Sequence, residues 1–291
     1  MTIDQARKKI VEATRHIYEK DEANNVAELL IENITKLPRS ERISKSSESL
    51  SIPQEELLES SILRLRQHEP IQYIINESWF AGMRFYVDKN VLIPRPETEE
   101  LVAWVVNEVK SQKHAEGIPS GKAKILDVGT GSGCIAISLK SKLKEIEMWA
   151  CDISDEALSV ARLNADTLNT AIDFVPVNFL DANQRKQLPA VDVIISNPPY
   201  VPKIDAREMK KNVVEYEPSV ALFIGDDNPM IFYEAIADFG REKLSKGGSI
   251  YAEIHENFGE QVKDLLLSKG YDAVQLKKGL QGKDRMIRAV N

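Results

Sequence analysis

From residue 124 onward, short apolar runs alternate with helical patterns, and this alternation constrains the fold more than any other feature. The strand-like runs cover residues 125–128, 148–151, 172–177, 191–195, 249–254, 271–276 and 286–290. Between them, apolar residues recur at helical spacing over residues 135–143, 155–168, 231–244 and 258–268. Parallel strands need a long crossover connection, and a helix usually provides it. The sequence therefore predicts an α/β fold with a mostly parallel sheet and helices on both faces.

Two regions of different pattern precede this alternation. In residues 1 to about 75, apolar residues recur at helical spacing, and Pro53 opens one helix at the first-turn position that proline favours. Residues 76–96 change to a period near two with turn residues in the middle, which predicts a β-hairpin. We therefore expect a helical domain at 1–75, a hairpin linker at 76–96 and a sheet domain at 97–291.

The composition of the 291 residues excludes several classes of protein. Apolar residues make up 43% and charged residues 29%, which excludes a wholly disordered or fibrous chain. No stretch approaches the ~18 unbroken apolar residues of a membrane helix, and we expect no signal peptide. Cys134 and Cys151 provide no disulfide framework, so we expect a cytoplasmic protein. The net charge of −7 argues against direct nucleic-acid binding, which usually needs a basic surface.

A glycine-rich loop follows the first predicted strand of the sheet and precedes a helix. It reads Asp127-Val128-Gly129-Thr130-Gly131-Ser132-Gly133. Glycines let the backbone turn sharply and approach a ligand, and a helix N-terminus supplies free N–H groups. Asp152 ends the next predicted strand. Its carboxylate suits the two hydroxyl groups of a ribose, because each oxygen can accept one hydrogen bond.

This loop permits two kinds of ligand and one purely structural role. A dinucleotide needs G-x-G-x-x-G to seat its pyrophosphate, whereas here the glycines alternate and an acid, Asp127, lies just upstream. Asp127 would oppose a pyrophosphate and favour a cation. S-adenosylmethionine carries both a ribose and a cationic amino-acid end. The structural alternative is a packing turn between strand and helix, with Asp127 as a helix cap.

A second motif lies at the end of the fourth predicted strand, at the kind of position where open α/β sheets bind ligands. It reads Ser196-Asn197-Pro198-Pro199-Tyr200. Two prolines fix the backbone, so that the Pro198 carbonyl stays aimed in one direction. Asn197 adds a side-chain acceptor, and Tyr200 adds a flat face. Two acceptors suit a planar NH2 group, which has two hydrogens to donate, although a rigid turn is the simpler interpretation of a bare Pro-Pro.

Together these motifs resemble the class I S-adenosylmethionine-dependent methyltransferases that act on planar amino groups. Further segments are similar to the release factor glutamine methyltransferases, the N5-glutamine or HemK-type family. These segments lie at residues 69–74, 80–87, 92–101, 217–222 and 282–285. The resemblance spans about residue 53 to residue 291, and the helical region fits that family's N-terminal domain in size. Two departures are Asn76, where we expect glycine, and Phe179, where we expect tryptophan.

The resemblance implies a Rossmann-like class I methyltransferase. Its sheet would have seven strands, the last of them antiparallel, and a small N-terminal all-α domain would recognise the substrate protein. The implied reaction moves a methyl group from S-adenosylmethionine to the side-chain amide nitrogen (N5) of the glutamine in the Gly-Gly-Gln motif of bacterial-type class I release factors, leaving S-adenosylhomocysteine. A sulfonium methyl is already a strong electrophile, so we expect no metal ion and no strong general base.

The resemblance also assigns roles to individual residues. For the cofactor it implies Asp127, Gly129, Thr130, Gly131, Ser132, Gly133, Asp152, Phe179 and Asn197. Asp152 would hold the ribose, and Phe179 would flank or cover the adenine. The expected catalytic residues are Asn197, Pro198 and Tyr200. The expected glutamine-binding residues are these three with Pro199 and Phe80.

Three other functions remain open. A ribosomal-protein glutamine methyltransferase would share the architecture, and an adenine-N6 nucleic-acid methyltransferase would also bind a planar NH2 group. A non-catalytic cofactor-binding adaptor would not need the acceptors of the second motif. Residues outside the two motifs suggest no further chemistry. His16, His68, His114 and His255 lack metal-ligand spacing, and neither cysteine has an obvious base partner.

Overall fold

The computed structural model describes residues 1–112, 122–225 and 227–291. The chain divides into two compact units. The first contains residues 1–77 and 210–216, and the second contains residues 78–209 and 217–291. The boundary after Glu77 groups the hairpin with the second unit, while the division into independent domains at 1–75, 76–96 and 97–291 stays a prediction. The loop expected around residues 117–121, like His114, lies outside the described residues.

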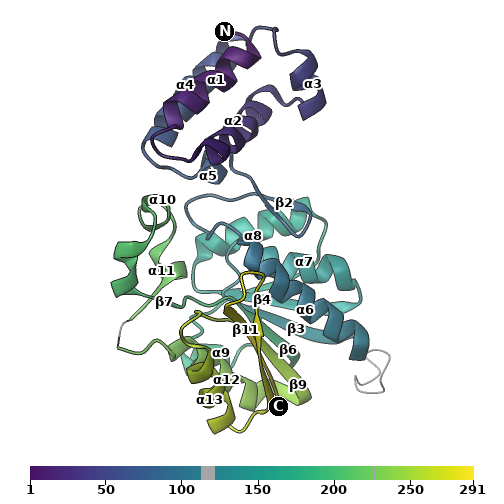
Figure 1. Cartoon of the computed structure of the whole chain (residues 1–291). Coiled ribbons are helices and arrows are strands. Elements are labelled where there is room, and N and C mark those ends of the chain that lie inside the picture. The colour runs from purple at the N-terminus through teal and green to yellow at the C-terminus, as the bar shows by residue number, and fades with distance from the viewer. Residues whose placement is uncertain (113–121, 226) are drawn as a thin grey trace. The chain divides into compact units, whose positions relative to one another are not determined.

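Helices make up the regular structure described in the first unit (Figure 1). They are α1 (Ile3–Thr14), α2 (Lys20–Thr35), α3 (Arg39–Ser44), α4 (Ile52–Arg66), α5 (Ile71–Ile75) and α10 (Lys211–Val214). The core is apolar, with Ile10, Leu30 and Leu58 buried among the facing sides of α1, α2 and α4. Apolar residues continue at helical spacing through Ile17 and Tyr18, but α1 ends at Thr14.

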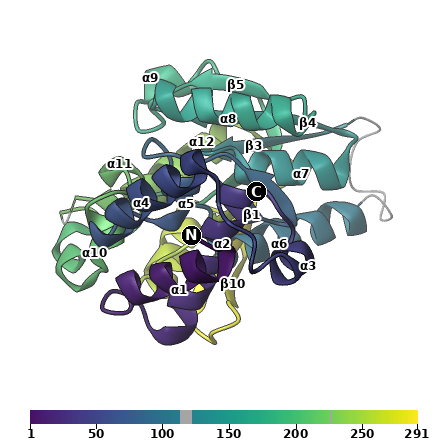
Figure 2. The same cartoon turned by 90° about the horizontal axis from the view of Figure 1, so that it is seen from above.

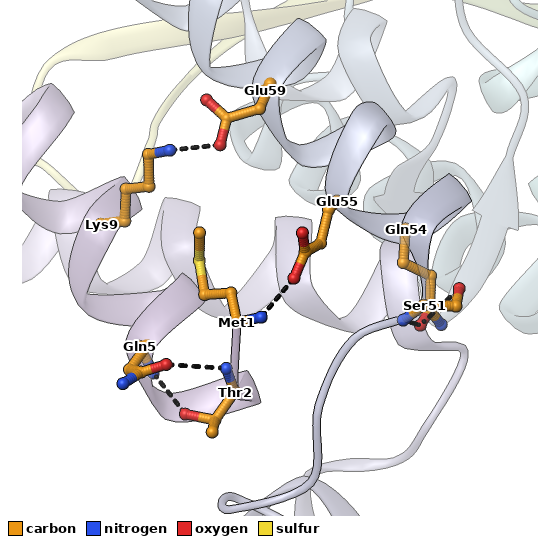
Figure 3. Close-up of polar contacts among 8 residues, drawn as sticks. All are labelled: Met1, Thr2, Gln5, Lys9, Ser51, Gln54, Glu55 and Glu59. Atoms are coloured by element: carbon orange, nitrogen blue, oxygen red, sulfur yellow. Dashed lines mark hydrogen bonds and ion pairs between the residues drawn. The ribbon is translucent and has the colours of Figure 1, made fainter.

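Polar side chains cap α1 and α4, and an ion pair joins the two helices (Figure 3). The Gln5 N–H donates to the Thr2 hydroxyl (3.2 Å), and the Thr2 N–H donates to the Gln5 side-chain oxygen (2.9 Å). An equivalent capping box begins α4. Lys9 on α1 forms an ion pair with Glu59 on α4. Exposed ion pairs contribute about 1 kcal/mol or less, so the buried apolar side chains hold the helices together.

A short hairpin opens the second unit. Its strands are β1 (Ser78–Phe80) and β2 (Met83–Phe85), paired antiparallel. The expected pairing was longer, and it stops at Phe85 because the next residue bonds elsewhere. The Tyr86 N–H donates to Asn164 Oδ1 (2.7 Å), and the Tyr86 carbonyl accepts from Asn164 Nδ2 (2.9 Å). A side chain thus takes the place of a strand partner and ends the ladder.

A seven-stranded sheet forms the centre of the second unit, in the order β10-β11-β9-β6-β3-β4-β5. Its strands are β3 (Ala123–Val128), β4 (Ile146–Asp152), β5 (Asp173–Pro176), β6 (Val191–Ser196), β9 (Leu244–Glu253), β10 (Asp272–Lys278) and β11 (Asp284–Val290). Neighbouring strands from β5 to β9 run parallel, while β11 is antiparallel to both β9 and β10. This confirms the predicted sheet and its antiparallel last strand. Figure 2 shows the edge strand β5 beside α8.

Helices cover both faces of this sheet (Figure 1). They are α6 (Pro96–Gln112), α7 (Cys134–Leu143), α8 (Asp155–Thr167), α9 (Ala182–Arg185), α12 (Ile231–Lys243) and α13 (Gly259–Ser268). On one face, Leu101 of α6 and Leu139 of α7 pack over Ile125. On the other, Phe239 of α12 packs over Leu126. Consecutive residues of β3 therefore enter opposite cores, as expected for a strand buried on both faces.

Shorter elements follow β6. They are β7 (Val201–Pro202), a 3₁₀ helix (Lys203–Glu208), α11 (Ser219–Leu222) and β8 (Phe223–Ile224), with β7 and β8 paired in parallel. In the part of the chain that the structure describes, no helix combines the length and apolarity needed to cross a membrane.

Candidate functional site

A pocket lies at the carboxyl ends of the parallel strands of the second unit. The register sets Val128 of β3 level with Cys151 of β4 and Ser196 of β6, so the segments that follow these strands meet at one edge of the sheet. Its lining includes Gly129, Gly131, Asp152, Phe179, Asn197, Pro198 and Pro199. Residues of both predicted motifs therefore share one cavity.

The glycine-rich loop approaches the pocket through two of its three glycines. Gly129 and Gly131 have φ angles of +73° and +53°, which favour glycine, and a Cβ added to either would meet no atom within 4 Å. Both glycines line the pocket. Their missing side chains thus leave open space beside the backbone, where a ligand can approach.

The third glycine has a different role. Gly133 precedes α7, and a Cβ there would lie 3.1 Å from Ile137 Cδ1 and 3.2 Å from the Ala161 Cβ on α8. It permits close packing of these helices and does not belong to the pocket lining. Thr130 and Ser132 are buried and are likewise absent from the lining. Direct cofactor contact by these three residues stays a prediction.

Asp127 is a buried carboxyl group with one unsatisfied oxygen. It is 0% exposed, and its Oδ2 accepts a hydrogen bond from the Thr130 hydroxyl (2.7 Å). Among the described residues, Oδ1 has no hydrogen-bond partner. Burial raises the pKa of Asp127 to about 7, although the bond from Thr130 acts in the opposite direction. A nearby cation would favour the ionised carboxylate and offset part of the desolvation cost.

Asp152 fixes the loop and also faces the pocket. Its Oδ2 accepts from the Gly131 N–H (2.9 Å), and its Oδ1 accepts from the Ser154 N–H (3.0 Å). Burial raises the pKa of Asp152, while these two N–H groups favour its charged form. Each carboxylate oxygen keeps a second lone pair, so both can still accept a ligand hydroxyl.

Phe179 provides a flat apolar wall after β5. Its ring packs edge-on against Phe239 with centroids 5.4 Å apart, and the Arg185 guanidinium lies 5.5 Å from its centroid. These contacts hold the ring in place. Val177 and Leu180 line the cavity next to it. An aromatic or heterocyclic ring fits a surface of this kind.

The second motif forms a rigid elbow, residues 197–200, at the end of β6. Asn197 Nδ2 donates to the Thr98 hydroxyl (3.1 Å), and Asn197, Pro198 and Pro199 line the pocket. Tyr200 does not line it. The Tyr200 hydroxyl donates to Glu253 Oε1 (2.9 Å), and burial raises the pKa of this tyrosine well above its usual range.

Two buried residues behind the elbow had no role assigned from the sequence. Glu253, at the end of β9, is 1% exposed, and its Oε2 accepts from the Thr98 hydroxyl (2.7 Å). Burial raises the pKa of Glu253, whereas the bonds from Thr98 and Tyr200 favour its charged form. One sequence signal could have pointed to Glu253: it is an acid inside the apolar run 249–254, and a buried strand rarely holds a carboxylate without partners.

Glu217 fastens one wall of the pocket. Its Oε2 accepts from the Ile93 N–H (3.1 Å), and its Oε1 accepts from Arg95 Nη2 (2.6 Å). This clamp joins the pocket-lining Leu92 to Pro218, residues far apart in the sequence. These two bonds anchor the segment around Glu217 beside the pocket.

Phe80 is not brought to this cavity. It is 1% exposed and packs edge-on against Phe85, with centroids 6.1 Å apart, inside the core beneath α6 and α7. The hairpin turns this side chain into the core and away from the pocket lining, so the structure gives no support to Phe80 as a wall of the substrate site. Cys134 is also buried, and burial raises the pKa of its thiol to about 12, which suppresses the reactive thiolate.

The three described histidines, His16, His68 and His255, also take no part in a metal cluster. Within residues 1–112, 122–225 and 227–291, no group of three or more His, Cys, Asp or Glu side chains could hold a metal ion. One histidine does lie near the elbow: the His255 ring centroid is 6.1 Å from that of Tyr200. No role had been expected for it.

Comparisons with known proteins find related families for both units of the chain. A family model described as "PrmC N-terminal domain" matches residues 5–75, and one described as "Methyltransferase small domain" matches residues 111–216. The release factor glutamine methyltransferase of Flavobacterium psychrophilum is 39% identical over 290 residues, covering 99% of both chains. The protein of the same name from Bacteroides thetaiotaomicron is 41% identical over 240 residues, covering 82% of both.

Solved structures share the fold at low identity. A methyltransferase from Pyrococcus furiosus has a TM-score of 0.51 at 16% identity, covering 80% of this chain and 96% of its own. The hMettl16 catalytic domain, solved with the MAT2A 3′UTR hairpin 6, has a TM-score of 0.55 at 15% identity, covering 83% of both chains. These similarities concern the fold alone.

Proposed function

The chain belongs to the release factor glutamine methyltransferase family, and we propose that it transfers a methyl group from S-adenosylmethionine to a release factor. The acceptor is the side-chain amide nitrogen of the glutamine in the Gly-Gly-Gln motif. One observation carries this proposal: the glycine loop with Asp152 and the elbow at Asn197 line the same pocket. A donor and a planar amide can therefore meet there.

The residues on the cofactor side of the pocket suit S-adenosylmethionine. Gly129 and Gly131 leave room for its methionine part, and Asp152 offers two acceptors to the ribose hydroxyls. Phe179 would flank the adenine. Asp127 lies behind the pocket lining with an unpaired buried oxygen, and the cationic amino group of the cofactor would compensate its charge. When bound, the cofactor supplies an electrophilic methyl group on a positively charged sulfur.

The elbow would orient the amide nitrogen. Asn197 Oδ1 and the Pro198 carbonyl can accept the two amide hydrogens and direct the nitrogen toward the methyl carbon. The cofactor beside the glycine loop would supply the methyl group to this nitrogen, and its sulfur would keep the electron pair of the C–S bond. Positive charge then develops on the nitrogen, and the two acceptors stabilise it until a proton leaves to solvent. Positioning and fixed dipoles supply the acceleration, without a strong base.

The first unit would recognise the release factor. Its residues 5–75 match the N-terminal domain of the family, and segment 210–216 joins it through a hydrogen bond from the Tyr216 hydroxyl to the Gln67 carbonyl (2.6 Å). We expect a whole release factor to have a much lower KM than a short Gly-Gly-Gln peptide. Equal KM values for both would contradict a recognition role for this unit.

The proposed reaction has a direct test. The protein is incubated with methyl-labelled S-adenosylmethionine and, separately, a class I release factor, a ribosomal large-subunit protein and RNA. Mass spectrometry should place one added methyl on the glutamine of Gly-Gly-Gln. A release factor with alanine at that glutamine should remain unlabelled. Label in the ribosomal protein alone, or in RNA alone, would overturn the proposal and identify the alternative substrate.

A further inference from the structure

A chain of buried hydrogen bonds leads from the pocket to the interior of the second unit. Asn197 Nδ2 donates to Thr98 Oγ1 (3.1 Å), and Thr98 Oγ1 donates to Glu253 Oε2 (2.7 Å). Thr98 and Glu253 are 2% and 1% exposed, so water does not compete for these bonds. Neither residue lines the pocket. The hydrogen bonds of Thr98 therefore reach the pocket lining through Asn197.

The donor and acceptor groups of the three side chains fix the direction of these hydrogen bonds. Both oxygens of the Glu253 carboxyl group accept hydrogen bonds, one from the Thr98 hydroxyl and one from the Tyr200 hydroxyl, so the single hydroxyl proton of Thr98 is directed to Glu253. The Thr98 oxygen can then only accept, and the side-chain group of Asn197 that can donate to it is its NH2. This leaves Asn197 Oδ1 on the other side of the amide. The orientation of Asn197 thus follows from Glu253, independently of how its amide atoms are assigned.

We infer that Glu253, acting through Thr98, is a positioning residue that keeps the Asn197 side-chain oxygen turned toward the substrate amide. The inference rests on the proposed function, in which that oxygen accepts a hydrogen from the glutamine NH2. If the Asn197 amide turned over, its own NH2 would face the substrate NH2. Two donors would then oppose each other, and one acceptor of the proposed pair would be lost.

The same carboxylate also holds the far end of the elbow. The Tyr200 hydroxyl donates to Glu253 Oε1 (2.9 Å), and the Tyr233 hydroxyl donates to the Glu253 backbone carbonyl (3.0 Å). One acceptor group therefore holds both Thr98, which orients Asn197, and Tyr200, which closes the elbow. A shared buried anchor of this kind limits independent movement of the two ends.

Two variants of Thr98 test the inference with matched shapes. Thr98→Val keeps the side-chain volume and removes the hydroxyl, whereas Thr98→Ser keeps the hydroxyl. We expect Thr98→Val to lower kcat by ~10-fold or more with KM and cofactor affinity within about threefold of wild type. Thr98→Ser should retain most of the wild-type rate. In an Asn197→Ala background, Thr98→Val should cause no further loss, because its effect acts through Asn197.

A second measurement does not depend on the substrate. In protein labelled with ¹⁵N-asparagine, the side-chain NH2 signal of Asn197 is the one absent from Asn197→Ala. Its hydrogen bonded to Thr98 should exchange with solvent ~10-fold faster in Thr98→Val than in wild type or Thr98→Ser. Unchanged exchange, or an equal rate loss in the Asn197→Ala background, overturns the inference. A wild-type protein inactive on release factor refutes the proposed function alone, and the exchange rates still decide the orientation.

Discussion

The two halves of the pocket are built in different ways. On the cofactor side, the glycine loop is held by the adjacent strand: the Gly129 and Thr130 N–H groups donate to the Cys151 carbonyl at 2.9 and 3.0 Å, and Asp152 accepts from Gly131. On the amide side, the elbow is held by side chains far away in sequence. Asn197 and Thr98 are 99 residues apart, and Tyr200 and Glu253 are 53 apart.

We expect this difference to separate effects on cofactor binding from effects on turnover. Backbone bonds between neighbouring strands form with the sheet itself, so the glycine loop depends little on remote side chains. The amide side depends on a buried polar network, in which each missing partner leaves another polar group unsatisfied. Substitutions on the cofactor side should therefore change cofactor affinity, and substitutions on the amide side should change kcat.

The largest effect is expected on the amide side. Asn197→Ala should lower kcat by ~100-fold or more, because an acceptor that stabilises the transition state is lost. Calorimetry should find cofactor affinity within a few fold of wild type. The comparison between the halves breaks down if this variant loses cofactor binding in parallel with turnover.

A smaller effect on a different quantity is expected from Asp152→Asn. Exchanging a carboxylate oxygen for an NH2 removes one acceptor for the ribose and one for either the Gly131 or the Ser154 N–H, which should weaken cofactor binding by ~1–3 kcal/mol. Asp166→Asn, on the exposed surface of α8, is the matched control and should bind normally. Wild-type affinity in Asp152→Asn, measured by calorimetry, would remove Asp152 from the cofactor site.

A pH-dependent effect is expected from Asp127, whose pKa burial raises to about 7 in the ligand-free protein. Between pH ~4 and ~7 the folded state keeps a proton that the unfolded chain loses, so Asp127 lowers stability as pH rises through that range. Asp127→Asn should remove this loss of stability with rising pH, because asparagine does not titrate. Its unfolding free energy relative to wild type should increase by at least about 1 kcal/mol from pH 5 to pH 8.

Denaturant unfolding of both proteins, without cofactor, measures this difference. Comparison with wild type cancels the titration of the other acids, and Asp166→Asn again serves as the control. A difference that is the same at pH 5 and pH 8 would mean that the Asp127 carboxyl titrates as in the unfolded chain. The burial argument would then be incorrect.

The smallest effect on activity is expected from Phe80→Leu. Phe80 packs against Phe85 in the core, so this change should cost ~1 kcal/mol of stability while kcat and KM stay within about twofold of wild type. Thermal unfolding and steady-state kinetics on the same preparation measure both quantities. A large rise in KM for release factor without loss of stability would restore Phe80 as a substrate contact.

Much of this fold was predictable because its signals are local. The alternation after residue 124 predicts the parallel sheet, and a strand followed by glycines and a helix predicts a ligand loop. The hairpin was predicted too long, since its end depends on Asn164, a residue of α8. The burial of Phe80 could not be predicted for a related reason: an aromatic residue in a short hairpin can face either side, and only tertiary packing decides which.

By itself, the sequence determined the order of strands and helices, the loop from Asp127 to Gly133 and the stiffness of the elbow, because each depends on residues adjacent in the chain. The tertiary structure alone decided which buried side chains support that elbow. Thr98 and Glu253 meet Asn197 and Tyr200 only after α6, β6 and β9 have packed together. No local pattern encodes such a meeting, since hydrogen bonds between remote side chains depend on how whole elements pack.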